Sequence, residues 1–282
     1  MVSEGCEPIC VERILVALDK SSHSLAALQA AIELARHYHA TLKGVFVEDI
    51  NVLNLARMPF HQEVGEYTAT VREISMDGLS REISVQSRWV THFFQKSINQ
   101  TDVNADFAVL RGYIHEMVNK ESQACDMVII GKSGTHPLGR RRHGSTAKAL
   151  IKHHLKPLLL IEENTQIGYP IIVMYENSPI GKLSLETARD LMDPAETLVI
   201  FLNDDNPDDF SITNTELKKW ANDNKIKISV KSFKSQAVSR VISIVEDMDT
   251  GLFILPHNND SPVIKRFEFY LEEIRLPILL IR

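Results

Sequence analysis

An internal repeat restricts the fold of this chain more than any other feature of its sequence. Residues 171–176 (IIVMYE) match residues 14–19 (ILVALD) at an offset of 157 positions. Near the end of each half, residues 157–161 (PLLLI) have a counterpart in residues 277–281 (PILLI). A period this long indicates a duplicated globular unit and not a solenoid of short repeats. We therefore expect a tandem repeat of one domain.

The repeat divides the 282-residue chain into two domains, residues 1–163 and 164–282, with a linker near residues 162–169. Two domains of about 150 residues each are usual for this length. The hydrophobic content of 44% is typical of a globular protein, and no apolar run approaches the roughly 18 residues of a membrane span. The N-terminus lacks a secretory signal pattern, and three cysteines do not make a disulfide framework. We expect a cytoplasmic protein without a membrane span or a nucleic-acid partner.

The first half begins with a strand–helix–strand pattern. Residues 11–18 (VERILVAL) predict a buried strand, and residues 41–47 (TLKGVFV) predict a second one. Between them lies an amphipathic helix that either Ser22 or Ser24 caps. Its apolar residues recur at helical spacing: Leu25, Leu28, Ile32 and Ala35. Since nothing between the strands indicates a hairpin, the pattern favours a βαβ unit and a parallel sheet.

The rest of the first half continues the alternation after a helical insert. Residues 79–94 predict a helix, residues 107–110 a short strand and residues 113–124 another helix. Within the insert we interpret Trp89 and Phe93 as packing residues and not as a platform for a nucleic-acid or nucleotide base. Together with the flanking runs, these elements predict an α/β fold with five parallel strands in each domain.

A glycine-bearing loop between two apolar runs is the strongest functional signal. The segment from Asp126 to Ile161 gives a buried strand, a loop with Gly131 and Gly134, a helix that follows Gly144, and a second buried strand. A helix start favours a phosphate because its N–H groups are unpaired and its dipole is positive there. The chain has a net charge of −6, yet residues 131–157 contain no acidic residue. The cations in that stretch are Lys132, Arg140, Arg141, Arg142, Lys148, Lys152 and Lys156.

The loop is not a P-loop. Gly131, Lys132 and Ser133 resemble the end of a Walker A motif, but position 126 is Asp where that motif requires Gly. The spacing Gly-x2-Gly-x9-Gly-Ser instead resembles that of the ATP-binding subgroup of the universal stress protein family. The alternative interpretation is a surface loop with turn glycines and a solvated basic face.

The second half repeats the strands but not the glycines. Glu176, Pro256 and Asn259 stand where the first half has Asp19, Gly131 and Gly134. The corresponding loop is also shorter, with 21 positions between its first residue and the following Pro, compared with 26 in the first half. Because proline has no N–H group, it removes a donor that a phosphate would use. The second domain therefore resembles a degenerate member of the family, and the first its ATP-binding kind.

The resemblance implies a fold and a set of binding residues. The fold is two tandem doubly wound domains, each a five-stranded parallel sheet of order 3-2-1-4-5 flanked by helices. The nucleotide would lie over the carboxyl ends of the first and fourth strands. Asp19 would contact it, although the same side chain could act as a helix N-cap, and the two roles are compatible. The implied binding residues are Ala17, Leu18, Asp19, Val47, Ile130, Gly131, Lys132, Gly134, Gly144, Ser145 and Thr146.

The resemblance also implies a function, namely a stress-response regulatory protein that binds an adenine nucleotide. ATP is the expected ligand, with AMP or ADP as close alternatives, either alone or with Mg²⁺. Two other hypotheses remain open: a slow ATPase, and an interaction module without a nucleotide. His136 and His143 lie in the loop, but neither has to face a γ-phosphate, so we assign no catalytic residue and no metal ligand.

The last strand of each half is apolar and would lie at the edge of its sheet. An exposed edge of this kind invites pairing with another strand. Because residues 157–161 and 277–281 belong to one chain, we expect them to pair with each other and to form an intramolecular pseudo-dimer. A further homodimer of whole chains is compatible with this arrangement.

Overall fold

The computed structural model describes residues 9–55, 62–64, 71–73, 76–133, 145–153, 155–234, 238–248, 250–257 and 267–282. The strands are β1 (Arg13–Ala17), β2 (Thr41–Asp49), β3 (Gln62–Val64), β4 (Val71–Glu73), β5 (Ala105–Gly112), β6 (Met127–Gly131), β7 (Leu158–Ile161), β8 (Ile171–Tyr175), β9 (Thr197–Asn203), β10 (Lys227–Phe233), β11 (Leu252–Pro256) and β12 (Ile278–Ile281). The helices are α1 (Ser22–Tyr38), α2 (Ile50–Leu55), α3 (Met76–Ile98), α4 (Ile114–Ser122), α5 (Ser145–His153), α6 (Pro179–Leu191), α7 (Pro207–Asp223), α8 (Val238–Glu246) and α9 (Phe267–Glu273).

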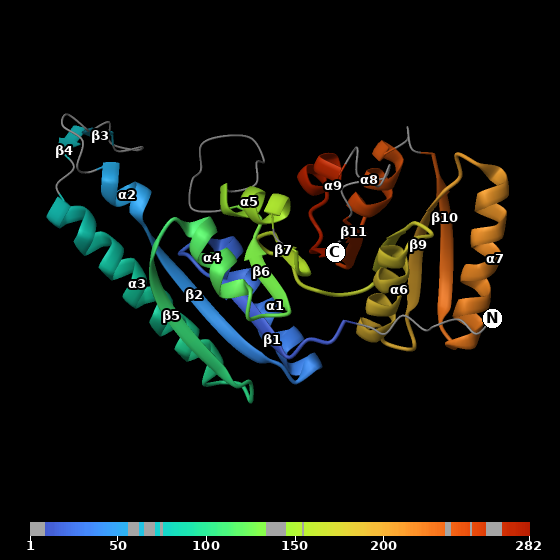
Figure 1. Ribbon diagram of the computed structural model, residues 1–282, viewed down its shortest axis with the longest axis horizontal. Coiled ribbons are helices and arrows are strands. Elements are labelled where there is room, and N and C mark those ends of the chain that lie inside the picture. Colours follow the sequence, from blue (N-terminus) through green and yellow to red (C-terminus); the bar gives the residue numbers. More distant parts are fainter. Residues whose placement is uncertain are drawn as a thin grey trace.

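Ten of the described strands form a single sheet that runs through the whole molecule (Figure 1). Its order is β10-β9-β8-β11-β12-β7-β6-β1-β2-β5. Neighbouring strands are parallel except at the centre, where β12 and β7 run antiparallel. The five strands of either half follow the same relative order, read outward from this centre. The pairing of β7 with β12 therefore joins the two expected five-stranded sheets into one continuous sheet.

The helices cover both faces of the sheet and create two apolar cores. One core contains side chains of α1, α3, α6 and α7, and the other contains side chains of α4, α5, α8 and α9. Alternate strand residues supply them, so that Val16 belongs to the first core and Leu15 to the second. Strands that are covered on both faces are expected to be apolar throughout. This double burial is why the central strands, such as β6, β7, β8, β11 and β12, appear in the sequence as apolar runs.

Some local expectations need correction. The N-cap of α1 is Ser21, and neither Ser22 nor Ser24 takes that position. The Ser21 backbone is extended, with φ −77° and ψ 156°, and its hydroxyl accepts a hydrogen bond from the Ser24 N–H. The insert is not wholly helical either, because β3 and β4 form an antiparallel pair ahead of α3.

The centre of the sheet joins the two halves through the predicted strand pairing. Leu159 of β7 lies opposite Leu279 of β12, and both side chains are fully buried. On the face covered by α1 and α6, the imidazole Nε2 of His37 lies 3.6 Å from the carboxylate of Asp190. We call this junction, the β7–β12 pair with the side chains that cross it, the seam. Burying a leucine stabilises a fold by roughly 1.5–3 kcal/mol, so the seam contributes strongly to the folded state.

Candidate functional site

The sheet brings the predicted strand-end residues of the first half together. Strand β1 lies between β6 and β2, and Ala17 is paired with Ile130 on one side and Val45 on the other. Leu18, Val47 and Ile130 are buried next to this edge. In open α/β sheets, ligands bind outside the carboxyl ends of such strands. The candidate site is therefore this edge together with the start of α5.

The structure describes only part of the phosphate side of the candidate site. Gly131 ends β6, and the predicted residues Ser145 and Thr146 open α5. Gly134 and Gly144 lie outside the described residues, as do the loop residues between them. The contacts of these loop residues with a phosphate therefore stay a prediction from the sequence.

Asp19 helps to hold the start of α1. Its Oδ1 atom accepts hydrogen bonds from the Ser21 N–H at 2.8 Å and from the Ser21 hydroxyl at 2.5 Å. Its own N–H donates to the Ser24 hydroxyl at 2.8 Å. Asp19 is therefore not the N-cap, but its carboxylate orients the residue that is. The contact with a nucleotide stays a prediction, and it would use a carboxylate that this turn has already positioned.

Gly131 has a packing role that the sequence alone does not reveal. A Cβ atom at this position would lie 2.8 Å from the Cβ of His23 and 3.1 Å from its carbonyl carbon. The first turn of α1 thus packs directly against the glycine. His23 is itself held in place, because its Nδ1 atom accepts a hydrogen bond from the Glu163 N–H at 2.9 Å.

We expect Gly131→Ala to lower the free energy of unfolding by about 1–3 kcal/mol, because overpacking forces the helix start to shift. Chemical denaturation of the full chain measures the change. Gly168→Ala is the matched control, since a Cβ there would meet its nearest atom at an ordinary 3.4 Å. Equal stability of the two variants would show that α1 does not restrict position 131.

Lys132 extends toward the second half. Its side chain is almost completely buried, and its Nζ atom donates to the Ile274 carbonyl and lies 3.8 Å from the Glu162 carboxylate. Its N–H donates to the Ile161 carbonyl at 2.7 Å. The resemblance implied that Lys132 is one of the nucleotide-binding residues. The structure engages its ammonium in the seam and its N–H with Ile161, so its contact with a nucleotide stays a prediction.

His257 and Arg282 occupy the matching position in the second half. The His257 N–H donates to the Ile281 carbonyl at 2.7 Å, as Lys132 does to Ile161. The Arg282 guanidinium donates across the seam to the Ile151 carbonyl of α5. Burial lowers the pKa of Arg282 to about 10, and burial together with Arg282 lowers the pKa of His257 to about 4. At neutral pH the guanidinium is therefore charged and the imidazole is neutral.

His257 should make the stability of the protein fall in acid. Its pKa is about 4 in the folded chain, and about 6.5 is usual for an unfolded one. The unfolded state therefore binds the proton first, and the contribution that is complete above pH 6.5 is lost as the pH falls toward 4. The loss is at most about 3 kcal/mol. Urea unfolding of wild type and His257→Gln between pH 7 and 4 measures it, and parallel pH profiles would contradict it.

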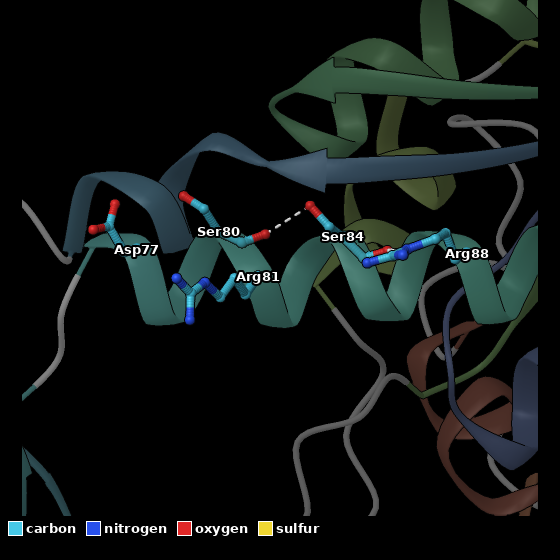
Figure 2. Close-up of a pocket in the computed structure, with 5 residues that line it drawn as sticks. All are labelled: Asp77, Ser80, Arg81, Ser84 and Arg88. Carbon is cyan, nitrogen blue, oxygen red and sulfur yellow. Dashed lines mark hydrogen bonds between the residues drawn. The ribbon is translucent and has the colours of Figure 1, made fainter.

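A hollow on the surface of α3 lies apart from these residues. It has a volume of about 450 Å³ and is lined by Asp77, Ser80, Arg81, Ser84 and Arg88. Figure 2 shows that all five come from one helix, with the Ser84 hydroxyl donating to the Ser80 carbonyl at 2.8 Å. A single helix surface encloses a ligand poorly. The hollow includes none of the predicted site residues, and we do not assign it to the candidate site.

The sequence of the first half shows the family of the chain. Residues 11–162 match the universal stress protein family. The match covers more than half of the chain, so this protein belongs to that family. It spans the first half as far as the beginning of the linker, and it includes every predicted binding residue. No curated protein matches the sequence.

Solved structures show that the fold of the whole chain has precedents. A universal stress protein from Archaeoglobus fulgidus aligns with a TM-score of 0.68 at 12% identity, over 96% of this chain and 98% of that one. A functionally unknown protein from Pseudomonas aeruginosa aligns with a TM-score of 0.60 at 10% identity, over 96% and 92%. At such identities the likeness extends to the fold alone. Every helix in the described part of the chain is too short or too polar to cross a bilayer.

Proposed function

We propose that the protein is a stress-response regulator that binds ATP, or the related AMP or ADP, in its first half. The observation that carries this proposal is the position of β1 between β6 and β2, with α5 following β6 in the chain. Ala17 is paired with both Ile130 and Val45, so the predicted contacts at Asp19, Val47 and Gly131 share one edge of the sheet. Membership of the universal stress protein family supports an adenine nucleotide as the ligand.

The phosphate contacts of the proposal come from the sequence of the loop and of α5. Gly134 and Gly144 would let the main chain approach the phosphates, and Ser145 and Thr146 would bind them at the helix start. The basic residues of the loop would neutralise their charge.

The proposal assigns one site to each chain. In the second half, Pro256 ends β11 where Gly131 ends β6, and proline has no N–H group to offer. We therefore divide the chain into a nucleotide-binding domain, residues 1–163, and a degenerate domain, residues 164–282. We place the function in the cytoplasm because the described cysteines, Cys10 and Cys125, are both free thiols.

The experiment that tests the proposal is the identification of bound nucleotide. Protein purified without added nucleotide is denatured, and the released small molecules are measured by mass spectrometry. We expect an adenine nucleotide in the wild-type sample. If none is released, and none binds when ATP, ADP or AMP is added, the chain is an interaction module and the proposal is wrong.

A further inference from the structure

Two cations, the buried Lys132 and the partly buried Arg282, cross the seam in opposite directions. Lys132 of the first half donates to the Ile274 carbonyl, which follows α9 of the second half. Arg282 of the second half donates to the Ile151 carbonyl and, at 3.4 Å, to the Leu150 carbonyl of α5. Carbonyl groups near the carboxyl end of a helix carry the negative end of its dipole, so they favour a cation. Each half thus binds the last helix of the other through a positive charge.

The main chain that leads to Arg282 is held by its surroundings. It follows β12, which is paired with β7 and is therefore held at the centre of the sheet. The N–H of His257 donates to the carbonyl of Ile281, the residue immediately before Arg282. With the main chain before it anchored in this way, Arg282 holds α5 against the seam.

The helix that Arg282 holds is the one at which the phosphates are proposed to bind. Leu150 lies five residues after Ser145, a distance of about 7.5 Å along the axis of an α-helix. Over so short a length a helix moves as a rigid rod, so a shift at its carboxyl end displaces its amino end. On the other side of the candidate site, the main chain after Gly131 is held because the side chain of Lys132 is bound in the seam. Both walls of the site are thus anchored to the second half.

We propose that Arg282 is a positioning residue for the nucleotide site, and that through it the second half regulates the affinity of the first for its phosphate-bearing ligand. This inference rests on the proposed function of the first half. Coupling between two parts of a protein is reciprocal, so a nucleotide bound at the start of α5 also strengthens the seam. A domain without a glycine pattern of its own thereby acquires a role in nucleotide binding.

The test compares three variants of the full chain with the wild type. Arg282→Met removes the charge and keeps an apolar side chain as long as the arginine stem up to Nε. Arg282→Lys keeps the charge, and Lys132 shows that an ammonium can bind a carbonyl across this seam. Arg240→Met is the control, because Arg240 is an exposed arginine on α8 of the same half. For each variant we would measure the Kd for ATP by calorimetry, the unfolding midpoint, and the hydrogen exchange of the α5 amides without nucleotide.

We expect Arg282→Met to raise the Kd about tenfold, within the usual range of coupling between sites. Exchange of the α5 amides should increase while that of β1 and β2 is unchanged. Arg282→Lys should keep the Kd and the exchange of the α5 amides near their wild-type values, and Arg240→Met should match the wild type. Wild-type affinity and exchange in Arg282→Met would overturn the inference. An equal loss of ATP affinity in Arg282→Met and Arg282→Lys, accompanied by a lower unfolding midpoint in both, would also overturn it. A purely structural residue would give that result.

The exchange measurement separates this inference from the proposed function. If the wild type binds no nucleotide, the proposed function fails and the coupling has no ligand to act on. Faster exchange confined to α5 in Arg282→Met would then still support the positioning of that helix by the second half. Unchanged exchange would reject the positioning as well.

Discussion

Leu279→Asp is expected to remove most of the stability of the folded chain. Leu279 is fully buried at the middle of β12 and pairs with Leu159 of β7, so its side chain lies in the core that both halves share. The change creates a cavity and buries a carboxylate without a partner, two effects that each cost several kcal/mol. Their combined loss, on the order of 5 kcal/mol, approaches the total stability of many domains.

Thermal unfolding followed by circular dichroism measures this loss, and size-exclusion chromatography shows whether the variant aggregates. Leu155→Asp is the matched control because Leu155 is 85% exposed just before β7. A surface substitution of this kind changes the free energy of unfolding by about 0.5 kcal/mol or less. If Leu279→Asp unfolds at the wild-type midpoint, the two halves fold without the seam.

Gly144→Val is expected to abolish ATP binding while the chain still folds. Gly144 precedes α5 in the glycine pattern of the first half, where the phosphates are proposed to approach the main chain. A branched side chain would occupy that space and would disfavour any positive φ that the glycine adopts. We expect the Kd for ATP to rise about 100-fold or more, a loss of at least about 2.7 kcal/mol.

Two measurements are needed for Gly144→Val. Calorimetry gives the affinity, and an unfolding midpoint close to that of Gly168→Ala shows that the chain is folded. A folded Gly144→Val protein with wild-type affinity would place the phosphates elsewhere. That result would favour the alternative interpretation of the loop as a solvated surface with turn glycines.

The central strands could be predicted because burial on both faces leaves a recognisable apolar run. Met127 and Ile129 face one core while Val128 and Ile130 face the other, so all four positions must be apolar. The strand pairing at the seam was predictable for a related reason. Residues 157–161 are too apolar to stay at an open edge, and the chain contains a matching run in residues 277–281.

The position of the helix cap was harder to predict. Ser21, Ser22 and Ser24 all have a hydroxyl near the start of α1, and propensity does not separate them. Only the backbone decides, because Ser21 is extended while the other two are already helical. The β3–β4 pair was missed because its two strands have three residues each, and so short a strand has almost no periodicity to detect.

The roles of Gly131 and Lys132 depend on neighbours that are distant in sequence. Gly131 is restricted by His23 at the start of α1, more than a hundred residues earlier. Lys132 reaches Ile274 in the second half, although it belongs to a basic loop that suggests an anion as its partner. The counterpart of Lys132 in the repeat is His257, whose imidazole is neutral at neutral pH, so the repeat gives no sign of a charged contact there. The sequence does not show that the two halves exchange contacts through Lys132 and Arg282.

The central claim is that one adenine nucleotide binds to each chain, in the first half. Titration of the full-length protein with ATP by isothermal calorimetry tests it most directly, since it gives the number of sites and the affinity in one measurement. The account predicts a stoichiometry of about one per chain, and loss of that site in Gly144→Val. Two equivalent sites per chain, or a single site that Gly144→Val leaves intact, would contradict it.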